Sequence, residues 1–216
     1  MTFDLFDPLP AEPAIEPLAD GAAVLRGFAR DAAPALLGAV ATITHAAPWR
    51  NMITPGGLQM AVAMTNCGTA GWVSDRGGYR YARHDPLTGQ PWPPMPALFL
   101  QLARDAAAQA GFPDFIPDAC LVNRYRPGTR LSLHQDRDEH NLGHPIVSVS
   151  LGLPAVFLFG GQRRADRSAR VRLAHGDVVV WGGPARLTFH GVAPLADGDH
   201  PLTGQERINL TLRRAL

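Results

Sequence analysis

Residues 131–136 read Leu-Ser-Leu-His-Gln-Asp, and their alternation of apolar and polar side chains is typical of a half-buried β-strand. Both leucines then share one face, while His134 and Asp136 share the other. An imidazole and a carboxylate on one face can hold a divalent metal, and His190 is the candidate third ligand. Two histidines with one carboxylate leave open coordination positions on iron(II). The alternative is that His-x-Asp arose by chance in a chain with eight histidines.

A second alternating strand lies near the end of the chain, where residues 207–213 read Arg-Ile-Asn-Leu-Thr-Leu-Arg. Its apolar residues share one face, and Arg207, Asn209 and Arg213 share the other. In one interpretation this polar face is solvated. In the other it points into the mouth of a barrel, where two arginines bracket a small dicarboxylate, because the planar guanidinium binds carboxylates with two hydrogen bonds.

The spacing of the elements predicts a mainly β fold with flanking helices. Helices are expected from Asp31, as N-cap, to about His45 and from Pro96 to Ala110. Closely spaced short strands punctuated by Gly and Pro indicate a sandwich or barrel of jelly-roll type. The expected strands are 22–25, 119–125, 131–136, 146–151, 155–159, 169–173, 177–181, 186–190 and 207–213.

Between these parts, residues 50–96 are rich in Gly, Thr, Asn and aromatic side chains and have no strong period, apart from a short strand expected at 59–64. They form either an irregular cap on the core or a flap that covers a substrate, since long loops in compact domains are often lids. The loop 163–172 is rich in arginine, which suits either a solvated surface or phosphate contacts.

Composition excludes several classes of protein. The chain has 216 residues and a net charge of +1, which argues against a bulk nucleic-acid binder but leaves room for a local basic groove. No apolar run is long enough for a membrane span, and the acidic start resembles no secretory signal. Cys67 and Cys120 are in no metal or redox spacing, so we expect free thiols and a cytoplasmic protein.

Taken together, these motifs resemble the AlkB family of iron(II)- and 2-oxoglutarate-dependent nucleic-acid demethylases. The similarity extends over roughly residues 15–214, and the ordered series His-x-Asp, His190 and Arg-x-Asn-x-Thr-x-Arg makes it specific. Further matching segments are 65–68, 117–125, 148–152 and 175–183. The resemblance implies a double-stranded β-helix (jelly-roll) core at about 117–214 and a nucleotide-recognition lid at about 50–96, within one domain spanning 1–216.

The resemblance also implies a role for each matching residue. His134, Asp136 and His190 match the iron ligands. Five residues match the 2-oxoglutarate site, and four match positions that contact the target nucleotide. The first set is Asn123, Tyr125, Arg207, Asn209 and Arg213, and the second is Trp72, Tyr79, Asp138 and Arg164. From the residues alone, Asn123 and Tyr125 could instead satisfy buried backbone groups, and Asp138 could be only a turn residue.

The implied activity is oxidative demethylation of 1-methyladenine and 3-methylcytosine, which releases formaldehyde, succinate and CO2. Its cofactor is Fe(II), and its co-substrates are 2-oxoglutarate and O2. The expected partner is alkylated single-stranded DNA, with duplex DNA and RNA as further candidates, and the expected state is a monomer away from membranes. Two rival interpretations remain: a 2-oxoglutarate-dependent hydroxylase of a protein or small molecule, and a non-catalytic β-barrel binding module.

Overall fold

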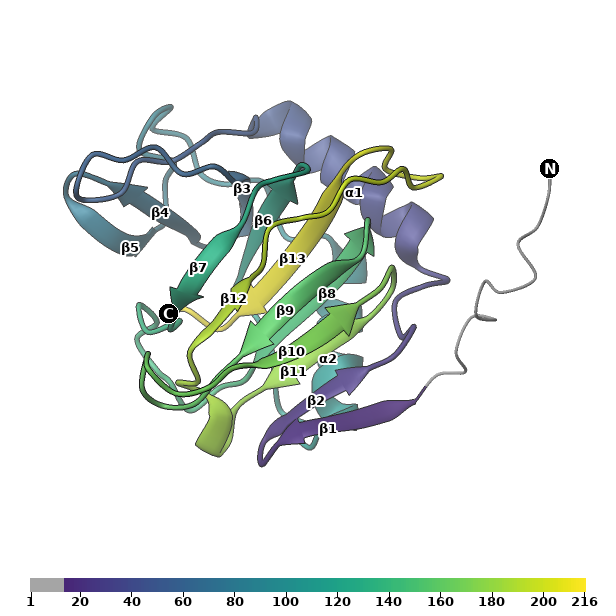
Figure 1. Cartoon of the computed structure of the whole chain (residues 1–216). Coiled ribbons are helices and arrows are strands. Elements are labelled where there is room, and N and C mark those ends of the chain that lie inside the picture. Colours follow the sequence, from purple (N-terminus) through teal and green to yellow (C-terminus); the bar gives the residue numbers. More distant parts are fainter. Residues whose placement is uncertain (1–13) are drawn as a thin grey trace.

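A computed structural model describes residues 14–216, which form two packed sheets, a separate hairpin and two helices (Figure 1). The helices are α1 (Ala33–Ala46) and α2 (Ala97–Gln109), with a 3-10 turn η1 (Gly183–Ala185). The strands are β1 (Ile15–Ala19), β2 (Ala22–Leu25), β3 (Ala63–Gly68), β4 (Gly71–Asp75), β5 (Gly78–Ala82), β6 (Ala119–Tyr125), β7 (Leu131–His134), β8 (Ile146–Gly152), β9 (Ala155–Phe159), β10 (Ala169–Leu173), β11 (Val178–Trp181), β12 (His190–Val192) and β13 (Arg207–Arg213).

The large sheet has the order β1-β2-β11-β8-β13-β6-β3, and the helices cover its outer face (Figure 1). That face carries Ile208, Leu210 and Leu212 from β13, which pack with helix residues such as Leu36 and Phe99. Burial of each such side chain contributes roughly 1.5–3 kcal/mol. Because β13 is central and alternates strictly, its apolar face is committed to the helices and its polar face must point to the other side.

The small sheet, in the order β10-β9-β12-β7, lies against the inner face of the large sheet (Figure 1). Phe157 and Phe159 from β9 pack with Trp181 from β11 between the two sheets, and the rings of Phe157 and Trp181 lie 5.9 and 4.9 Å from the ring of His190. All seven residues of β13 are buried. The solvated interpretation of its polar face is therefore wrong, because the small sheet covers that face.

The stretch 50–96 is partly regular. Its strand β3 pairs with β6 and extends the large sheet, whereas β4 and β5 form a two-stranded hairpin at the edge of the molecule (Figure 1). The buried ion pair between Arg50 and Asp85, with Arg50 also over the ring of Trp92, ties the flanking loops together. The hairpin is thus anchored and projects beside the open end of the sandwich.

Several predicted boundaries are wrong, for local reasons. Helix α1 begins after Ala32, with no side-chain cap from Asp31, because a proline in its first turn sets the helical backbone instead. The strand expected at 186–190 is a 3-10 turn and loop, and β12 begins only at His190. Strand β7 ends at His134, so Asp136 lies in a loop beyond it. The strand expected at 59–64 runs instead over Ala63–Gly68.

Candidate metal centre

His134, Asp136 and His190 come together on the inner side of the small sheet and in the loop that follows β7. Their ligand atoms all lie within 4.8 Å of one another. Strands β7 and β12 are antiparallel neighbours with His134 opposite His190, which sets the two ring centroids 4.4 Å apart. Asp136 enters from the loop, with carboxylate oxygens 3.5 Å from Nε2 of His134 and 3.7 Å from Nε2 of His190.

Backbone hydrogen bonds orient both imidazoles. Nδ1 of His134 lies 2.9 Å from the carbonyl of Ser132, and Nδ1 of His190 lies 2.9 Å from the carbonyl of Thr188. Because a carbonyl oxygen only accepts, each Nδ1 must carry a proton, and each Nε2 faces Asp136. This is the arrangement in which histidine binds a metal through Nε2.

The charges around the cluster also suit a cation. Burial and the neighbouring His134 lower the pKa of His190 to about 4, so its ring is neutral at pH 7. Burial opposes ionisation of Asp136, but Arg213 and both histidines outweigh it and hold its pKa well below the usual range. Burial lowers the pKa of His134, but the hydrogen bond and the charge of Asp136 outweigh that effect and raise it, so a metal would take the place of a proton on this ring. Two imidazole nitrogens and one carboxylate fit iron(II).

Arg213 is engaged with this cluster. Its Nε and NH2 donate to Oδ2 of Asp136 at 2.9 and 2.5 Å, and its NH1 lies 3.3 Å from the hydroxyl of Tyr81 on the hairpin. Burial lowers the pKa of Arg213, but Asp136, Tyr81 and Glu139 outweigh that effect and raise it. The guanidinium therefore stays charged beside the metal cluster.

Arg207, at the other end of β13, is the contrasting case. Its side chain is almost fully buried, NH2 donates to Oγ of Ser150 at 3.0 Å, and the guanidinium lies over the ring of Tyr125 at 5.0 Å. Its Nε and NH1 have no hydrogen-bond partner among residues 14–216. Burial lowers its pKa, which indicates a guanidinium in need of a negative partner. An anionic ligand such as a carboxylate would satisfy it.

The two asparagines near Arg207 differ in whether their side-chain atoms all have hydrogen-bond partners. Asn209 is used internally, since its Nδ2 donates to Ser148 and to the carbonyl of Val149, and its Oδ1 accepts from Asn123 and Thr211. The Oδ1 atom of Asn123 has no partner among the described residues. Both asparagines lie on paired positions of β6 and β13, so the two strands line one wall of the space that contains Arg207.

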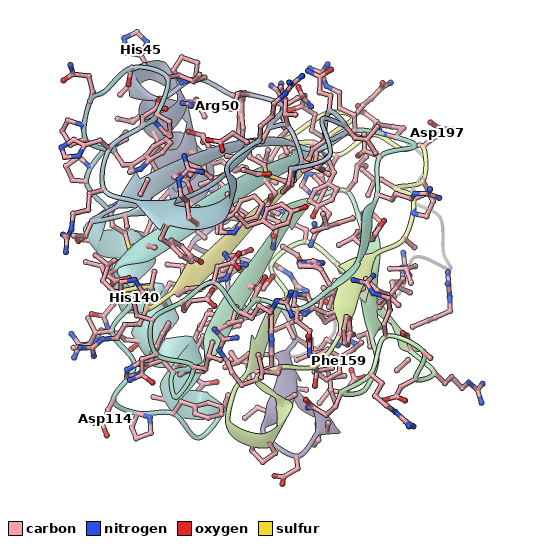
Figure 2. All side chains as sticks on the ribbon, turned by 90° about the vertical axis from the view of Figure 1, so that its left-hand side faces the viewer. His45, Arg50, Asp114, His140, Phe159 and Asp197 are labelled. Carbon is pink, nitrogen blue, oxygen red and sulfur yellow. The ribbon has the colours of Figure 1, made fainter. Side chains whose placement is uncertain are left out.

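Three of the four predicted nucleotide contacts lie together on one side of the cluster. Nε1 of Trp72 donates to Oδ2 of Asp138 at 2.8 Å, and the ring of Trp72 stacks on Tyr79 with centroids 5.6 Å apart. In Figure 2 the hairpin faces the viewer, and His140, two residues after Asp138, is labelled below it. Asp138 is thus more than a turn residue, because it ties the loop that carries Asp136 to the hairpin.

The fourth, Arg164, lies beside both histidines. Its guanidinium donates to the carbonyl of Leu133 and sits 5.1 Å from the ring centre of Phe189. These two residues immediately precede His134 and His190. The loop of Arg164 therefore packs against the residues next to two of the clustered histidines, and its role as a substrate contact stays a prediction.

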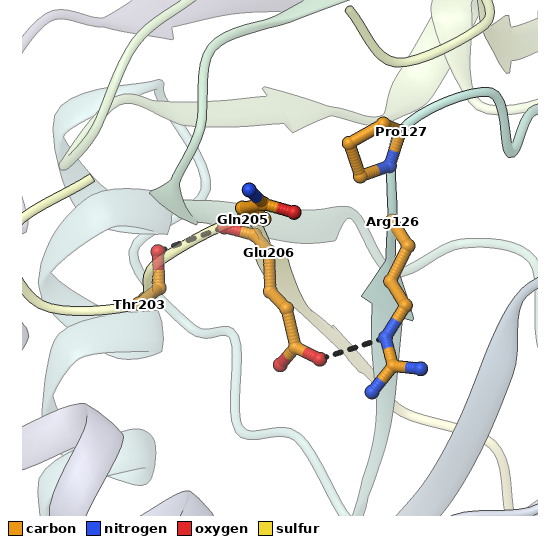
Figure 3. A pocket seen from close by; sticks show the side chains of 5 residues that line it. All are labelled: Arg126, Pro127, Thr203, Gln205 and Glu206. Carbon is orange, nitrogen blue, oxygen red and sulfur yellow. Dashed lines mark hydrogen bonds and ion pairs between the residues drawn. The ribbon is translucent and has the colours of Figure 1, made fainter. Parts of the chain in front are cut away.

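An open hollow of about 410 Å³ lies elsewhere, lined by Arg126, Pro127, Thr203, Gln205 and Glu206 (Figure 3). Its one carboxylate, Glu206, accepts from Nε of Arg126 at 3.0 Å and is already paired. The lining contains no residue of the metal cluster, so this hollow is separate from the candidate metal centre.

The sequence missed three residues that surround Asp136, namely Tyr81, Glu139 and Arg186. Glu139 is buried and lies between Arg186 and Arg213, with its carboxylate 2.9 and 3.4 Å from them. Arg186 donates to the backbone carbonyls of Asp136 and His144. Glu139 and Arg186 lie in loops, which have no periodicity that gives their direction, and Tyr81 lies on β5 within a stretch that has no strong period, so no pattern in the sequence placed them.

Comparisons with known proteins agree with this geometry. Residues 21–213 match the 2OG-Fe(II) oxygenase superfamily. The alpha-ketoglutarate-dependent dioxygenase AlkB of Escherichia coli is 58% identical over 95% of both chains. A DNA N(6)-methyladenine demethylase of Arabidopsis thaliana, ALKBH1C, is 35% identical over 62% of this chain and 35% of its own. The structure of OsALKBH1 superposes with a TM-score of 0.81 at 29% identity and covers 93% of this chain and all of the other.

Proposed function

The chain belongs to the 2-oxoglutarate- and iron(II)-dependent oxygenases and, within them, to the AlkB dioxygenases, and from this premise we propose that it removes methyl groups from alkylated nucleic-acid bases. Its cofactor is Fe(II), and its co-substrates are 2-oxoglutarate and O2. The observation that carries the proposal is the combination of a His-Asp-His cluster, a buried arginine with two unpaired nitrogens on the same face of β13 as Arg213, and an aromatic hairpin hydrogen-bonded to the carboxylate of Asp138.

In this proposal His134, Asp136 and His190 hold the iron, and their geometry supports the assignment. When bound, iron with 2-oxoglutarate and O2 supplies the oxidation of an N-methyl carbon, which leaves as formaldehyde. The protein's own residues hold the two Nε2 lone pairs and the Asp136 carboxylate toward one point. His190 is buried from water between the sheets, whereas His134 stays about one third exposed.

For the co-substrate, we assign the distal carboxylate of 2-oxoglutarate to Arg207, since two of its nitrogens lack acceptors. Tyr125 and Asn123 line the same wall, and Asn209 supports Asn123 from the neighbouring strand. Arg213 stays with Asp136 and stabilises the inner end of the site. The two guanidiniums therefore have different tasks, one binding the co-substrate and one holding a ligand.

For the target base, Trp72 provides an aromatic face and Asp138 a carboxylate bonded to it. Bases such as 1-methyladenine and 3-methylcytosine are cationic, and a cationic ring stacks favourably on an aromatic face. Asp138 can also accept a hydrogen bond from an exocyclic amine. Tyr79, which is half exposed, and Arg164 lie where the flanking backbone would pass. A base in a duplex must be flipped out at a cost of a few kcal/mol, which favours single strands.

The direct test is release of formaldehyde from a single-stranded oligonucleotide containing 3-methylcytosine, with iron(II) and 2-oxoglutarate. We expect turnover by the wild type and none by Asp136→Ala, because the cluster loses its only anionic ligand while β7 keeps its apolar face. If succinate formed but no methylated strand gave formaldehyde, the result would instead favour a hydroxylase of a protein or small molecule.

Charge recognition is tested separately, with paired oligonucleotides carrying cationic 3-methylcytosine or neutral 3-methylthymine. The wild type should act much faster on the cationic lesion. Asp138→Ala should narrow that gap mainly by slowing the cationic substrate. Equal rates in the wild type, or an unchanged ratio in the variant, would remove this role from Asp138.

We further propose that the protein acts as one domain and as a monomer, with residues 50–96 as the lid and 117–214 as the core. Duplex DNA and RNA remain candidate substrates beside single-stranded DNA. Two free, buried thiols and a nucleic-acid substrate favour the cytoplasm. Within residues 14–216 no helix combines the length and hydrophobicity needed to cross a bilayer.

A further inference from the structure

Asp136 is not positioned by a strand, so side chains must hold it. Strand β7 ends two residues earlier, and Asp136 follows in the loop. Arg186 donates from NH1 to its backbone carbonyl at 2.6 Å, while Arg213 donates to its carboxylate from Nε and NH2. The direction of the carboxylate therefore depends on where these two guanidiniums lie.

Glu139 is the residue that both arginines share. Its side chain is 1% exposed, with Oε2 2.9 Å from NH2 of Arg186 and Oε1 3.4 Å from Nε of Arg213. The hydroxyl of Tyr81, on the hairpin, donates to Oε1 at 2.9 Å. Three elements distant in sequence thus converge on one buried carboxylate, which does not itself lie among the metal-binding atoms.

We propose that Glu139 is a positioning residue for the metal centre, which holds Arg186 and Arg213 against the backbone and the carboxylate of Asp136. The inference rests on the proposed function in taking Asp136 as a metal ligand. Two buried carboxylates, Asp136 and Glu139, balance the two buried guanidiniums. That balance leaves the Asp136 carboxylate available to a divalent cation.

The reason is electrostatic as well as geometric. Without the charge of Glu139, the attraction of Arg213 falls on Asp136 alone, and a metal has to compete with it. Arg186, whose side chain is 4% exposed, would keep only backbone carbonyls as partners. An unbalanced positive charge in a buried site also opposes the entry of a divalent cation directly.

The test is metal binding without nucleic acid, using Co(II) as a spectroscopic substitute for iron in the anaerobic full-length protein. Glu139→Gln keeps an oxygen that can accept from Tyr81 but loses the charge. We expect its Co(II) affinity to fall about 10- to 100-fold, the usual effect of removing a residue that supports a ligand. The visible Co(II) bands should shift as well, because the ligand geometry changes.

The matched control is Asp85→Asn, which breaks the partly buried ion pair with Arg50 and touches no residue of the cluster. It should lower the melting temperature of the metal-free protein but leave Co(II) affinity and bands unchanged. The proposal would be overturned if Glu139→Gln kept the Co(II) affinity and the visible bands of the wild type and only lost thermal stability, as the control does.

Glu139→Asp keeps the charge but shortens the reach, and it should bind Co(II) with an affinity between those of the wild type and Glu139→Gln. If Glu139→Gln does not fold, Glu139→Asp provides the test. A wild-type Co(II) affinity in Glu139→Asp would then contradict the inference. The proposed function and the positioning role of Glu139 can be refuted independently. A wild type that binds Co(II), and loses that binding in His190→Ala, yet releases no formaldehyde would refute only the proposed function.

Discussion

At the scale of single residues, the two arginines of β13 lie in two different environments. Both are buried and lie on the same polar face, six positions apart. Arg213 meets carboxylates inside the protein, whereas Arg207 keeps two nitrogens without partners in the described chain. A buried unpaired guanidinium is costly, so its presence indicates a ligand that completes it.

Substituting Arg207 should therefore affect the co-substrate more than the fold. Removing one partner of a buried ion pair costs roughly 3–5 kcal/mol, so Arg207→Ala should raise the KM for 2-oxoglutarate on the order of a hundredfold or more. Arg207→Lys should recover only part of the affinity for 2-oxoglutarate, because lysine lacks the planar guanidinium that binds a carboxylate with two hydrogen bonds. Steady-state kinetics at varied 2-oxoglutarate measure this, and Arg126→Ala, in the hollow of Figure 3, is the control expected to behave as wild type. An unchanged KM in Arg207→Ala would reverse the assignment.

His190 leads to a pH prediction for the metal-free protein. Its pKa of about 4 lies below the ordinary value of 6.5, so the unfolded chain takes up the proton first as the pH falls. The stability that this histidine contributes is present above pH 6.5 and is lost as the pH falls toward 4. Urea unfolding in the presence of a chelator measures this effect. Between pH 6.5 and pH 4, the free energy of unfolding should fall less in His190→Gln than in the wild type. Parallel pH profiles for the two proteins would contradict the shift.

At the scale of elements, the metal centre depends on how closely β12 approaches β7. His190 pairs with His134, and the register shifts before Val192. Gly191 lies at this irregularity, where an added Cβ would come within 2.6 Å of the carbonyl oxygen of Leu131. A glycine is needed here for close approach of the two backbones, and that approach sets the spacing of the imidazoles.

Gly191→Ala should therefore push β12 away from β7 and separate the histidines. We expect a lower melting temperature and Co(II) affinity reduced by about tenfold or more, since small displacements of ligands weaken metal sites. The matched control is Gly38→Ala in α1, where nothing lies within 4 Å of the new Cβ and alanine favours the helix. Wild-type metal binding in Gly191→Ala would show that the strands can relax around the methyl group.

At the scale of the whole molecule, the net charge of +1 hides an uneven distribution. Exposed arginines gather on β10 and the loop before it, including Arg167 and Arg170, near the loop that brings Arg164 to the metal centre. In the same loop Arg163 is already paired with Asp166 at 3.0 Å. A local basic edge of this kind suits the phosphates on one side of a bound strand.

This edge predicts a modest salt dependence of binding. Each phosphate contact adds about −0.7 to the slope of log affinity against log salt for single strands. The double substitution of Arg167 and Arg170 by alanine should therefore make the slope shallower by about 1.4, if both contact phosphates. Fluorescence anisotropy with a methylated oligonucleotide over a salt series measures it. Arg104→Ala, on the exposed side of α2, should leave the slope as in the wild type, and an unchanged slope in the double variant would exclude this edge from the interface.

The sequence by itself determined the mainly β class, most strands, both helices and the identity of the metal cluster, because each has a local signal. Alternation in 207–213 assigned its two faces, and the ordered motifs marked His134, Asp136 and His190 without any knowledge of their distances. Those signals depend only on period and residue type, which are properties of short segments.

Only the tertiary structure decided that β13 is buried on both faces, that Asp136 lies beyond its strand, and that Glu139, Tyr81 and Arg186 surround it. It also separated the surroundings of Arg207 and Arg213, which the sequence presents as equivalent. The physical reason is that burial and ion pairing arise between segments far apart in the chain. A loop side chain has no period to give its direction, so its role appears only when its partners are in place.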